Sequence, residues 1–117
     1  MRSSKSHRVV FVTCGTLTEA RRIARKVVGA RLAACVSILL GPVESVYRWK
    51  GAVENAREIL VVIKTTRSRL AALEEQILKL HSYDVPEFIV LPIVAGSRPY
   101  LDWLDESVSA PKRTARK

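Results

Sequence analysis

The sequence is poor in the residues that build disulfide scaffolds, metal clusters and membrane spans. It has two cysteines and two histidines among 117 residues, too few cysteines for a disulfide-stapled fold. No apolar run approaches the roughly 18 residues of a membrane-spanning helix, so we expect no membrane partner. The apolar run at residues 9–12 is too short for the hydrophobic region of a signal peptide, and we therefore expect a cytoplasmic protein.

Signature motifs of common enzyme classes are also missing. The chain has no G-x-S-x-G nucleophile elbow, no phosphate-binding P-loop, no H-E-x-x-H zinc motif and no dinucleotide fingerprint. These patterns carry the nucleophile, the phosphate or the metal in their respective enzymes. We therefore expect a protein that is not an enzyme and requires no cofactor.

The chain is basic, and most of its net positive charge lies at its two ends. The net charge is +9, and residues 1–8 and 110–117 hold seven of the twenty basic side chains and no acidic one. Basic tails can bind nucleic acid through its phosphates, but neither end carries the interleaved aromatic side chains of a stacking surface. We therefore expect residues 1–7 and 109–117 to be disordered tails, without a nucleic-acid partner.

Residues 8–108 show the patterns of one domain in which strands and helices alternate. Strands are predicted by β-branched and alternating apolar patterns in five segments, residues 9–13, 34–40, 43–49, 59–63 and 88–94. Apolar side chains recur at helical spacing in residues 20–28 and 70–80. A capping box formed by Thr16 and Glu19 is expected to open the first helix, and Ser97 precedes a short final one.

The order of these segments predicts an α+β fold. With residues 34–49 taken as one strand that bends at Pro42, the order strand, helix, two strands, helix and strand is the ferredoxin-like βαββαβ arrangement. This is an antiparallel sheet with two helices on one face, here plus a short C-terminal helix. Turn residues at 50–51 and 54–55 predict a long hairpin between the third and fourth strand segments. Residues 59–63 are apolar on both faces, so we expect the bare face of the sheet to meet a partner.

Six short motifs occur in a fixed order along this domain. They are RLAACV at 31–36, YRWKG at 47–51, Glu58 leading to Lys64 and Thr65, HSY at 81–83, PE at 86–87, and YLxW at 100–103. Each motif alone is weak, but the ordered set is specific. With this set the chain resembles the CutA family of divalent-cation tolerance proteins along nearly all of residues 8–107.

The resemblance implies a homotrimer of ferredoxin-like protomers whose sheets join edge to edge around a threefold axis. It also implies a role in tolerance of divalent metal ions, notably copper, with copper binding described for some members and no established catalytic activity. The alternative, by analogy of fold with trimeric PII proteins, is a small-molecule sensor or signalling scaffold that uses clefts between protomers.

Soft metal ions prefer thiolate and imidazole ligands, so the candidate metal ligands are Cys14, Cys35 and His81. Their spacing matches no local metal motif, and a site would need residues from distant segments or from several protomers. Val12 and Leu80 stand where some bacterial CutA proteins have a cysteine and a histidine. The alternatives are core packing for Cys35 and a contact of His81 with the helix C-terminus.

Charged and aromatic side chains near the strands form two further sets. Charges beside apolar strands are usually paired, so we expect ion pairs within the trimer or, alternatively, a cleft between protomers where Lys64 and Glu87 meet a small anion or metal. The candidates for that cleft are Glu58, Lys64, Tyr83 and Glu87. Aromatic side chains often anchor interfaces, and the candidates for the trimer interface are Tyr47, Trp49 and Trp103, which could also stack on a ligand.

Overall fold

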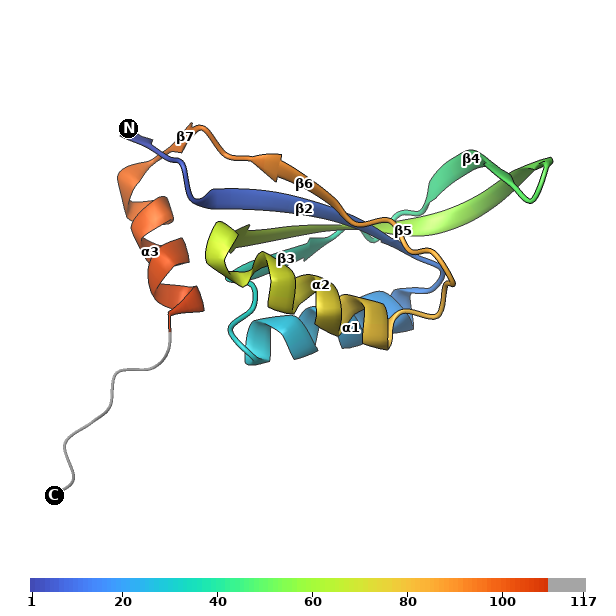
Figure 1. Cartoon of the computed structure of the whole chain (residues 1–117), viewed down its shortest axis with the longest axis horizontal. Helices are drawn as coiled ribbons and strands as arrows, with labels where there is room; N and C mark the ends of the chain where they lie inside the picture. The colour runs from blue at the N-terminus through green and yellow to red at the C-terminus, as the bar shows by residue number, and fades with distance from the viewer. Residues whose placement is uncertain (110–117) are drawn as a thin grey trace, which may run out of the picture.

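The computed structural model describes residues 1–109 and has an α+β fold with an antiparallel sheet and three helices (Figure 1). This confirms the predicted class and the predicted helices. The elements in chain order are β1 (Arg2–Ser3), β2 (His7–Cys14), α1 (Leu17–Gly29), β3 (Cys35–Ile38), β4 (Val43–Trp49), β5 (Ala52–Thr66), a 3₁₀ turn (Arg67–Arg69), α2 (Leu70–Leu80), β6 (Ile89–Pro92), β7 (Ala95–Gly96) and α3 (Arg98–Val108).

The main sheet has the strand order β3-β5-β2-β6, and every pairing in it is antiparallel. Strand β5 is 15 residues long and pairs with three other strands. Its C-terminal half pairs with β2 and β3 inside the sheet, while its N-terminal half pairs with β4. The β4–β5 hairpin projects beyond the helices, as Figure 1 shows.

The hairpin turn lies at Lys50 and Gly51, as predicted. Their φ angles are 49° and 82°, in the left-handed region that glycine adopts without a steric penalty. The second expected turn, at residues 54–55, is wrong, because these residues lie within β5. There the Asn55 side-chain amide donates to Glu44 Oε2 across the hairpin at 3.0 Å, so polar residues continue the strand pair instead of ending it.

Helices α1 and α2 cover one face of the sheet and form the core with it. Alternate side chains of β2 and β5 point to this face, because successive strand residues alternate sides. The fully buried apolar side chains are Val10, Val12, Cys14, Val61 and Ile63 from the strands and Ile23, Val27, Leu73 and Ile77 from the helices. Burial of each large side chain contributes about 1.5–3 kcal/mol, so this layer holds the fold together.

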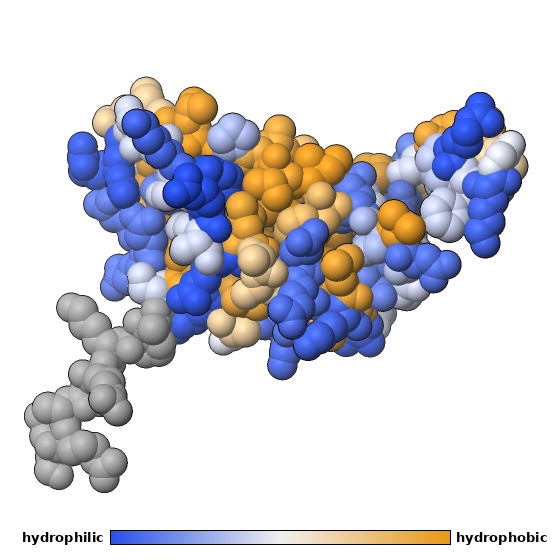
Figure 2. All heavy atoms as spheres, viewed as in Figure 1, coloured by the Kyte–Doolittle hydropathy of each residue, from blue (hydrophilic) through white to orange (hydrophobic). Residues whose placement is uncertain are grey.

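The opposite face of the sheet is only half-buried. Val9 and Phe11 of β2 and Val62 of β5 point to it and keep intermediate exposure. At the edge of the sheet, Ile89, Val90 and Leu91 of β6 are 39–48% exposed. Figure 2 shows hydrophobic side chains gathered over the middle of the molecule, where β6 lies in Figure 1. No helix among residues 1–109 is long and apolar enough to cross a membrane.

The expectation that residues 1–7 form a disordered tail is wrong. Strand β1 pairs with β7, and the Arg2 guanidinium contacts the carboxylates of Asp102 at 2.7 Å and Asp105 at 2.8 Å. His7 is 1% exposed, and its Nε2 lies 2.8 Å from Asp105 Oδ1. The basic segment is ordered because α3 offers it acidic partners. Of the expected C-terminal tail, residues 110–117 lie outside the described part of the chain.

Candidate functional site

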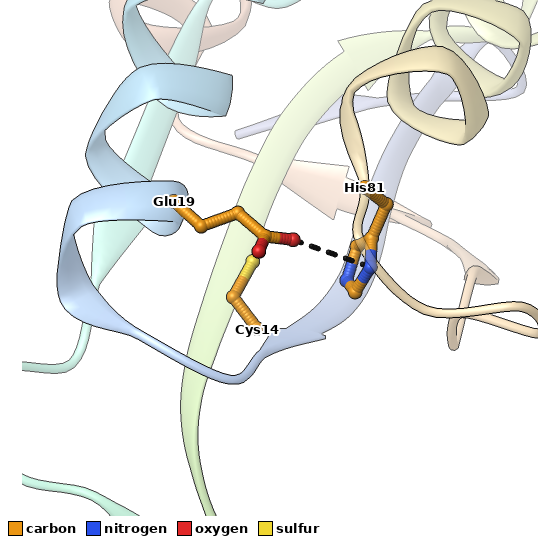
Figure 3. Close-up of side chains that lie close together, drawn as sticks. All are labelled: Cys14, Glu19 and His81. Carbon is orange, nitrogen blue, oxygen red and sulfur yellow. Dashed lines mark ion pairs between the residues drawn. The ribbon is translucent and has the colours of Figure 1, made fainter.

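The side chains of Cys14, Glu19 and His81 form a buried cluster where β2, α1 and the end of α2 meet (Figure 3). Cys14 is the last residue of β2, Glu19 lies in the first turn of α1, and His81 follows α2. One donor atom from each residue lies within 4.8 Å of the other two. The structure thus brings together two of the three predicted metal ligands and adds a carboxylate.

The Glu19 carboxylate holds the start of α1 against the segment after α2. The Ser82 N–H donates to Oε1 at 3.0 Å, and the Ser82 hydroxyl donates to Oε2 at 2.8 Å. Burial raises the pKa of Glu19, but these two hydrogen bonds and the nearby His81 and Arg22 outweigh it, and the net pKa is lowered. Only half of the expected capping box forms: Thr16 Oγ1 accepts from the Glu19 N–H, while the carboxylate turns to Ser82.

Both ring nitrogens of His81 have partners. Nε2 donates to the Thr13 carbonyl oxygen at 2.7 Å, which requires a proton on Nε2 because a carbonyl only accepts. Nδ1 accepts from the Tyr83 N–H at 3.1 Å and lies 3.3 Å from Glu19 Oε1. The ring therefore bonds to β2 instead of to carbonyls at the end of α2. A metal ion at Nδ1 would have to replace the Tyr83 N–H.

Cys14 is a free, fully buried cysteine. Burial, followed by the charges of Glu19 and Glu58, raises the pKa of its thiol to about 12. Because a thiolate is the form that binds metal, a metal ion would have to displace this proton. The sulfur, oxygen and nitrogen donors suit a soft or borderline ion, yet each of them already serves the fold.

Cys35 lies apart from this cluster and outside the core. It is half-buried on β3, opposite Lys64 of β5, whereas Cys14 lies opposite Ile59. Five residues of strand separate the two pairings, a distance of about 16 Å. Cys35 therefore cannot join Cys14 and His81 within one protomer.

A cleft of about 740 Å³ lies between the β4–β5 hairpin and the segment that follows α2. It is lined by Thr13, Ser45, Val46, Tyr47, Trp49, Glu58, Tyr83, Asp84, Val85, Pro86 and Glu87. The Tyr83 hydroxyl donates to Glu58 Oε2 at 2.9 Å, and burial together with Glu58 raises the pKa of both Tyr83 and Glu87. Three of the four predicted cleft residues thus share one cleft.

Lys64, the fourth predicted cleft residue, lies elsewhere. It is opposite Val9 on the sheet, and its Nζ donates to Ser37 Oγ at 2.7 Å. Lys64 and Glu87 therefore do not share a cleft within one protomer. A cleft between protomers, in which the two would meet a small anion or metal, stays a prediction. The cleft lining contains acidic side chains and no basic one.

The three predicted interface aromatics separate into two regions. Tyr47 and Trp49 line the cleft, whereas Trp103 lies on α3 with its ring 5.5 Å from that of Tyr100 and is 44% exposed. Their role in a trimer stays a prediction. All three keep enough exposed surface to contact another molecule.

Sequence reasoning missed the roles of Glu19, Ser82 and His7 in the structure. The sequence predicts Glu19 only as a helix cap and places His7 in a disordered tail. Nothing in their local sequence shows that Glu19 meets Ser82 or that His7 meets Asp105. For the contact between His7 and Asp105, the sequence offers one signal: acidic residues in the final helix could pair with the basic N-terminal segment.

Comparison with known proteins places the chain in a family. The sequence model of the CutA1 divalent ion tolerance protein family matches residues 8–107. The divalent-cation tolerance protein CutA of Thermus thermophilus is 46% identical over 99 residues, which cover 85% of this chain and 95% of that protein. The chloroplastic CutA protein of Arabidopsis thaliana is also 46% identical, but the match covers only 54% of its length.

Solved structures agree with the sequence comparison. CutA of Synechococcus elongatus superposes with a TM-score of 0.87 at 40% identity, covering 92% of this chain and 95% of that one. The structure from Archaeoglobus fulgidus, described as a periplasmic divalent cation tolerance protein, gives a TM-score of 0.85 at 36% identity, covering 88% and 99%. Fold, length of match and identity all agree, and the chain belongs to the CutA1 divalent ion tolerance protein family.

Proposed function

We propose that this protein serves tolerance of divalent metal ions, copper above all, as a homotrimer of ferredoxin-like protomers that catalyses no reaction. The family match over residues 8–107 carries this proposal, together with a relative named for divalent-cation tolerance at 46% identity. None of the relatives named above is described as a sensor, so the proposal does not extend to PII-type signalling. A cytoplasmic location stays a prediction, and the Archaeoglobus relative is described as periplasmic.

The cluster of Cys14, Glu19 and His81 is the proposed point of metal contact. It combines a thiol, a carboxylate and an imidazole, the donor set that copper accepts. Binding has to remove the Cys14 proton and replace a hydrogen bond of His81, and each lost hydrogen bond costs about 1 kcal/mol. The proposed interaction is therefore weak, and it strengthens as pH rises because binding releases a proton.

Copper titration of matched variants tests the metal contact. Cys14→Ser and His81→Ala should each weaken Cu(I) binding, whereas Cys35→Ser, on β3 outside the cluster, should leave it unchanged. Thermal unfolding of each variant separates loss of the site from loss of the fold. Equal affinity in wild type, Cys14→Ser and His81→Ala would remove the cluster as a metal site.

Growth of a host that lacks its own CutA tests the tolerance role itself. Expression of this chain should raise the copper concentration at which growth stops, compared with an empty vector. The Cys14→Ser variant should restore less tolerance than Cys35→Ser. No difference between the chain and the empty vector would contradict the proposed function.

A further inference from the structure

A second hollow, the arginine pocket, lies where the end of β5, the 3₁₀ turn and the last turn of α3 meet. Its volume is about 460 Å³, and two of its eight lining residues are Arg67 and Arg69. Figure 1 shows α3 beside this end of the sheet, away from the β4–β5 hairpin. The pocket shares no residue with the acidic cleft or with the Cys14–Glu19–His81 cluster, so a ligand bound there would be separate from both.

The arginine pocket carries positive charge that the described chain leaves unmatched. Its one acidic lining residue is Asp105, whose Oδ1 lies 2.8 Å from His7 Nε2 and whose Oδ2 lies 2.8 Å from Arg2 Nη1. That carboxylate therefore already has its own partners. No ion pair joins Arg67 or Arg69 to an acidic side chain of residues 1–109. Their two charges thus await an anion from outside these residues.

Arg69 is held in place by the end of α3. Its Nε donates to the Val108 carbonyl oxygen at 2.9 Å, which favourably places a cation at a helix C-terminus. Capping explains only this one bond, because Arg31 covers the neighbouring carbonyls of Ser107 and Ser109. The two Nη atoms of Arg69 make no hydrogen bond to a described residue, and they are not fully enclosed. A fixed guanidinium therefore presents its remaining donors at the pocket.

Hydroxyl groups stand beside the two guanidinium groups. Thr66 is only 6% exposed, and its Oγ1 shares a hydrogen bond of 3.2 Å with Ser68 Oγ. One bond between two hydroxyls uses one proton, so the pair keeps a second O–H donor. Ser109 also lines the pocket, but its hydroxyl already donates to the Asp105 carbonyl oxygen. The donors left for a ligand are therefore two guanidinium groups and one hydroxyl.

This donor set suits a phosphoryl group better than a carboxylate or a simple ion. A guanidinium binds oxyanions through parallel N–H groups, and a phosphoryl group offers three terminal oxygens and close to two negative charges. The volume falls within the roughly 300–1,000 Å³ of small-molecule sites and far exceeds that of chloride. Val108 is the one apolar lining residue, so the pocket offers little to the carbon skeleton of a ligand.

The sequence beyond the pocket adds attraction for anions. Ser109 lines the pocket, and residues 110–117 follow it with four basic side chains and no acidic one. Clustered charge of one sign raises the local concentration of oppositely charged ligands. An anion therefore meets a positive field at this end of the chain before it meets the two arginines.

We propose that the arginine pocket binds a small phosphate compound. Its terminal phosphoryl group lies between Arg67 and Arg69, and one of its oxygens accepts from the Thr66–Ser68 hydroxyl pair. The assignment rests on two guanidinium groups without an acidic partner among residues 1–109, and on a buried hydroxyl pair beside them. It does not depend on the proposed metal contact.

Calorimetric titration of the full chain with inorganic pyrophosphate tests the proposal. The protein is freed of metal and kept in Tris buffer with about 0.15 M sodium chloride, which screens weak long-range attraction. We expect saturable binding of one pyrophosphate per chain and much weaker binding of malonate, a dicarboxylate of similar size. Arg69→Gln should weaken pyrophosphate binding about tenfold or more, and the more exposed Arg67→Gln about threefold or more.

Matched variants separate the pocket from general charge. Arg57→Gln removes the same charge from an exposed position of β5, nine residues and about 30 Å from Thr66, and should bind like wild type. Arg113→Gln removes one charge from the basic segment after the pocket and should change the affinity by less than about twofold. Cys14→Ser should also bind pyrophosphate normally, so this proposal and the metal contact fail separately.

A further variant guards against loss of the fold. Arg69→Gln gives up the bond to Val108, whereas the Arg67 side chain makes no hydrogen bond or ion pair with a described residue. Arg67→Glu should therefore keep the wild-type melting temperature and abolish pyrophosphate binding, because it reverses the charge. Unchanged binding in this variant would contradict the proposal.

Three other outcomes would overturn the inference. The first is no saturable binding of pyrophosphate, and the second is malonate binding of equal strength, which would make the pocket a site for any anion. The third is a single-stranded oligonucleotide that displaces pyrophosphate and binds more tightly, since the pocket would then be part of a nucleic-acid surface. Equal losses in Arg57→Gln and Arg67→Gln would show an effect of net charge and contradict a defined site as well.

Discussion

Single buried residues decide what the Cys14–Glu19–His81 cluster can do. Each of its donor atoms is protonated, hydrogen-bonded or both, so the cluster stabilises the junction of β2, α1 and α2 as it stands. A metal ion would compete with these interactions. The same geometry therefore supports the fold and limits metal affinity.

The thiol of Cys14 should resist chemical modification in the native protein. Its side chain is fully buried and its pKa is raised to about 12, so almost no thiolate exists at pH 8. We expect peptide mass spectrometry to find Cys14 unmodified after treatment with iodoacetamide. In guanidinium chloride the same residue should react fully, and equal modification in both states would contradict the burial described here.

Glu19→Ala should lower the free energy of unfolding by about 1–3 kcal/mol, because the N–H and hydroxyl of Ser82 lose their acceptor. The folded pKa of Glu19 is lowered, so its contribution is complete above the unfolded pKa and disappears as pH falls through the folded value. Denaturant unfolding at pH 7 and below about pH 4 should show a smaller difference in acid.

Glu75→Ala is the matched control for Glu19→Ala. Glu75 lies on the exposed face of α2 and only contacts Lys79 at 3.5 Å, so its loss should change stability by no more than about 0.5 kcal/mol. If Glu19→Ala were equally destabilising at both pH values, the charge of Glu19 would contribute nothing.

At the scale of elements, the β4–β5 hairpin is a local pairing, whereas strand β1 depends on contacts far along the chain. The β4–β5 hairpin extends away from the helices and supplies one wall of the cleft. Strand β1 has only two residues and pairs with another two-residue strand, too little to be stable by itself. Its order therefore depends on the side chains that join it to α3.

Asp105→Ala should release the N-terminal segment from α3. Burial raises the pKa of Asp105, but hydrogen bonds from Arg2 and His7 outweigh it, and the net pKa is lowered. The ionised carboxylate thus holds both partners, and its loss should speed hydrogen exchange of the Ser4 amide, which donates to the Val94 carbonyl. Acid should have the same effect on wild type as pH falls through the lowered pKa of Asp105.

Glu106→Ala provides the comparison for this experiment, because Glu106 is a neighbouring acidic residue on α3 without a side-chain bond to Arg2 or His7. The Ser4 amide should exchange in this variant at the wild-type rate. Unchanged exchange in Asp105→Ala would show that strand pairing alone orders the segment.

At the scale of the whole molecule, the protomer is elongated, with extents of 59 × 35 × 24 Å, and one face of its sheet is half-buried and rich in apolar side chains. Exposing such an apolar face to water is unfavourable for a monomer. Large exposed apolar patches usually mark surfaces that contact another molecule. This supports the proposed trimer, in which other protomers would cover Val9, Phe11 and Val62.

Light scattering at low micromolar concentration should give about three times the chain mass of 13.1 kDa. Val62→Asp places a charge on the half-buried sheet face and should shift the mass toward that of one chain. Leu78→Asp, at a position 50% exposed on α2, should leave the mass unchanged. A wild-type mass of 13.1 kDa would exclude the trimer.

The sequence by itself determined the three helices and the main strands of residues 8–108, but not β1 or the first half of β5. Apolar periodicity and turn residues act over a few neighbouring positions, so they predict only such local structure. Residues 9–13 and 20–28 followed their local patterns, and the family motifs along 8–107 identified the relatives. Turn residues also predicted the hairpin turn at Lys50 and Gly51, where left-handed backbone is required. It also wrongly placed a second turn inside β5.

Only the tertiary structure decided which polar side chains meet. Glu19 bonds Ser82, Thr13 bonds His81, and His7 bonds Asp105 across 63, 68 and 98 residues of chain. It also paired Lys64 with Ser37 and left the cleft acidic. A buried polar group must find a partner wherever packing brings one, and no periodic pattern in the sequence encodes that choice.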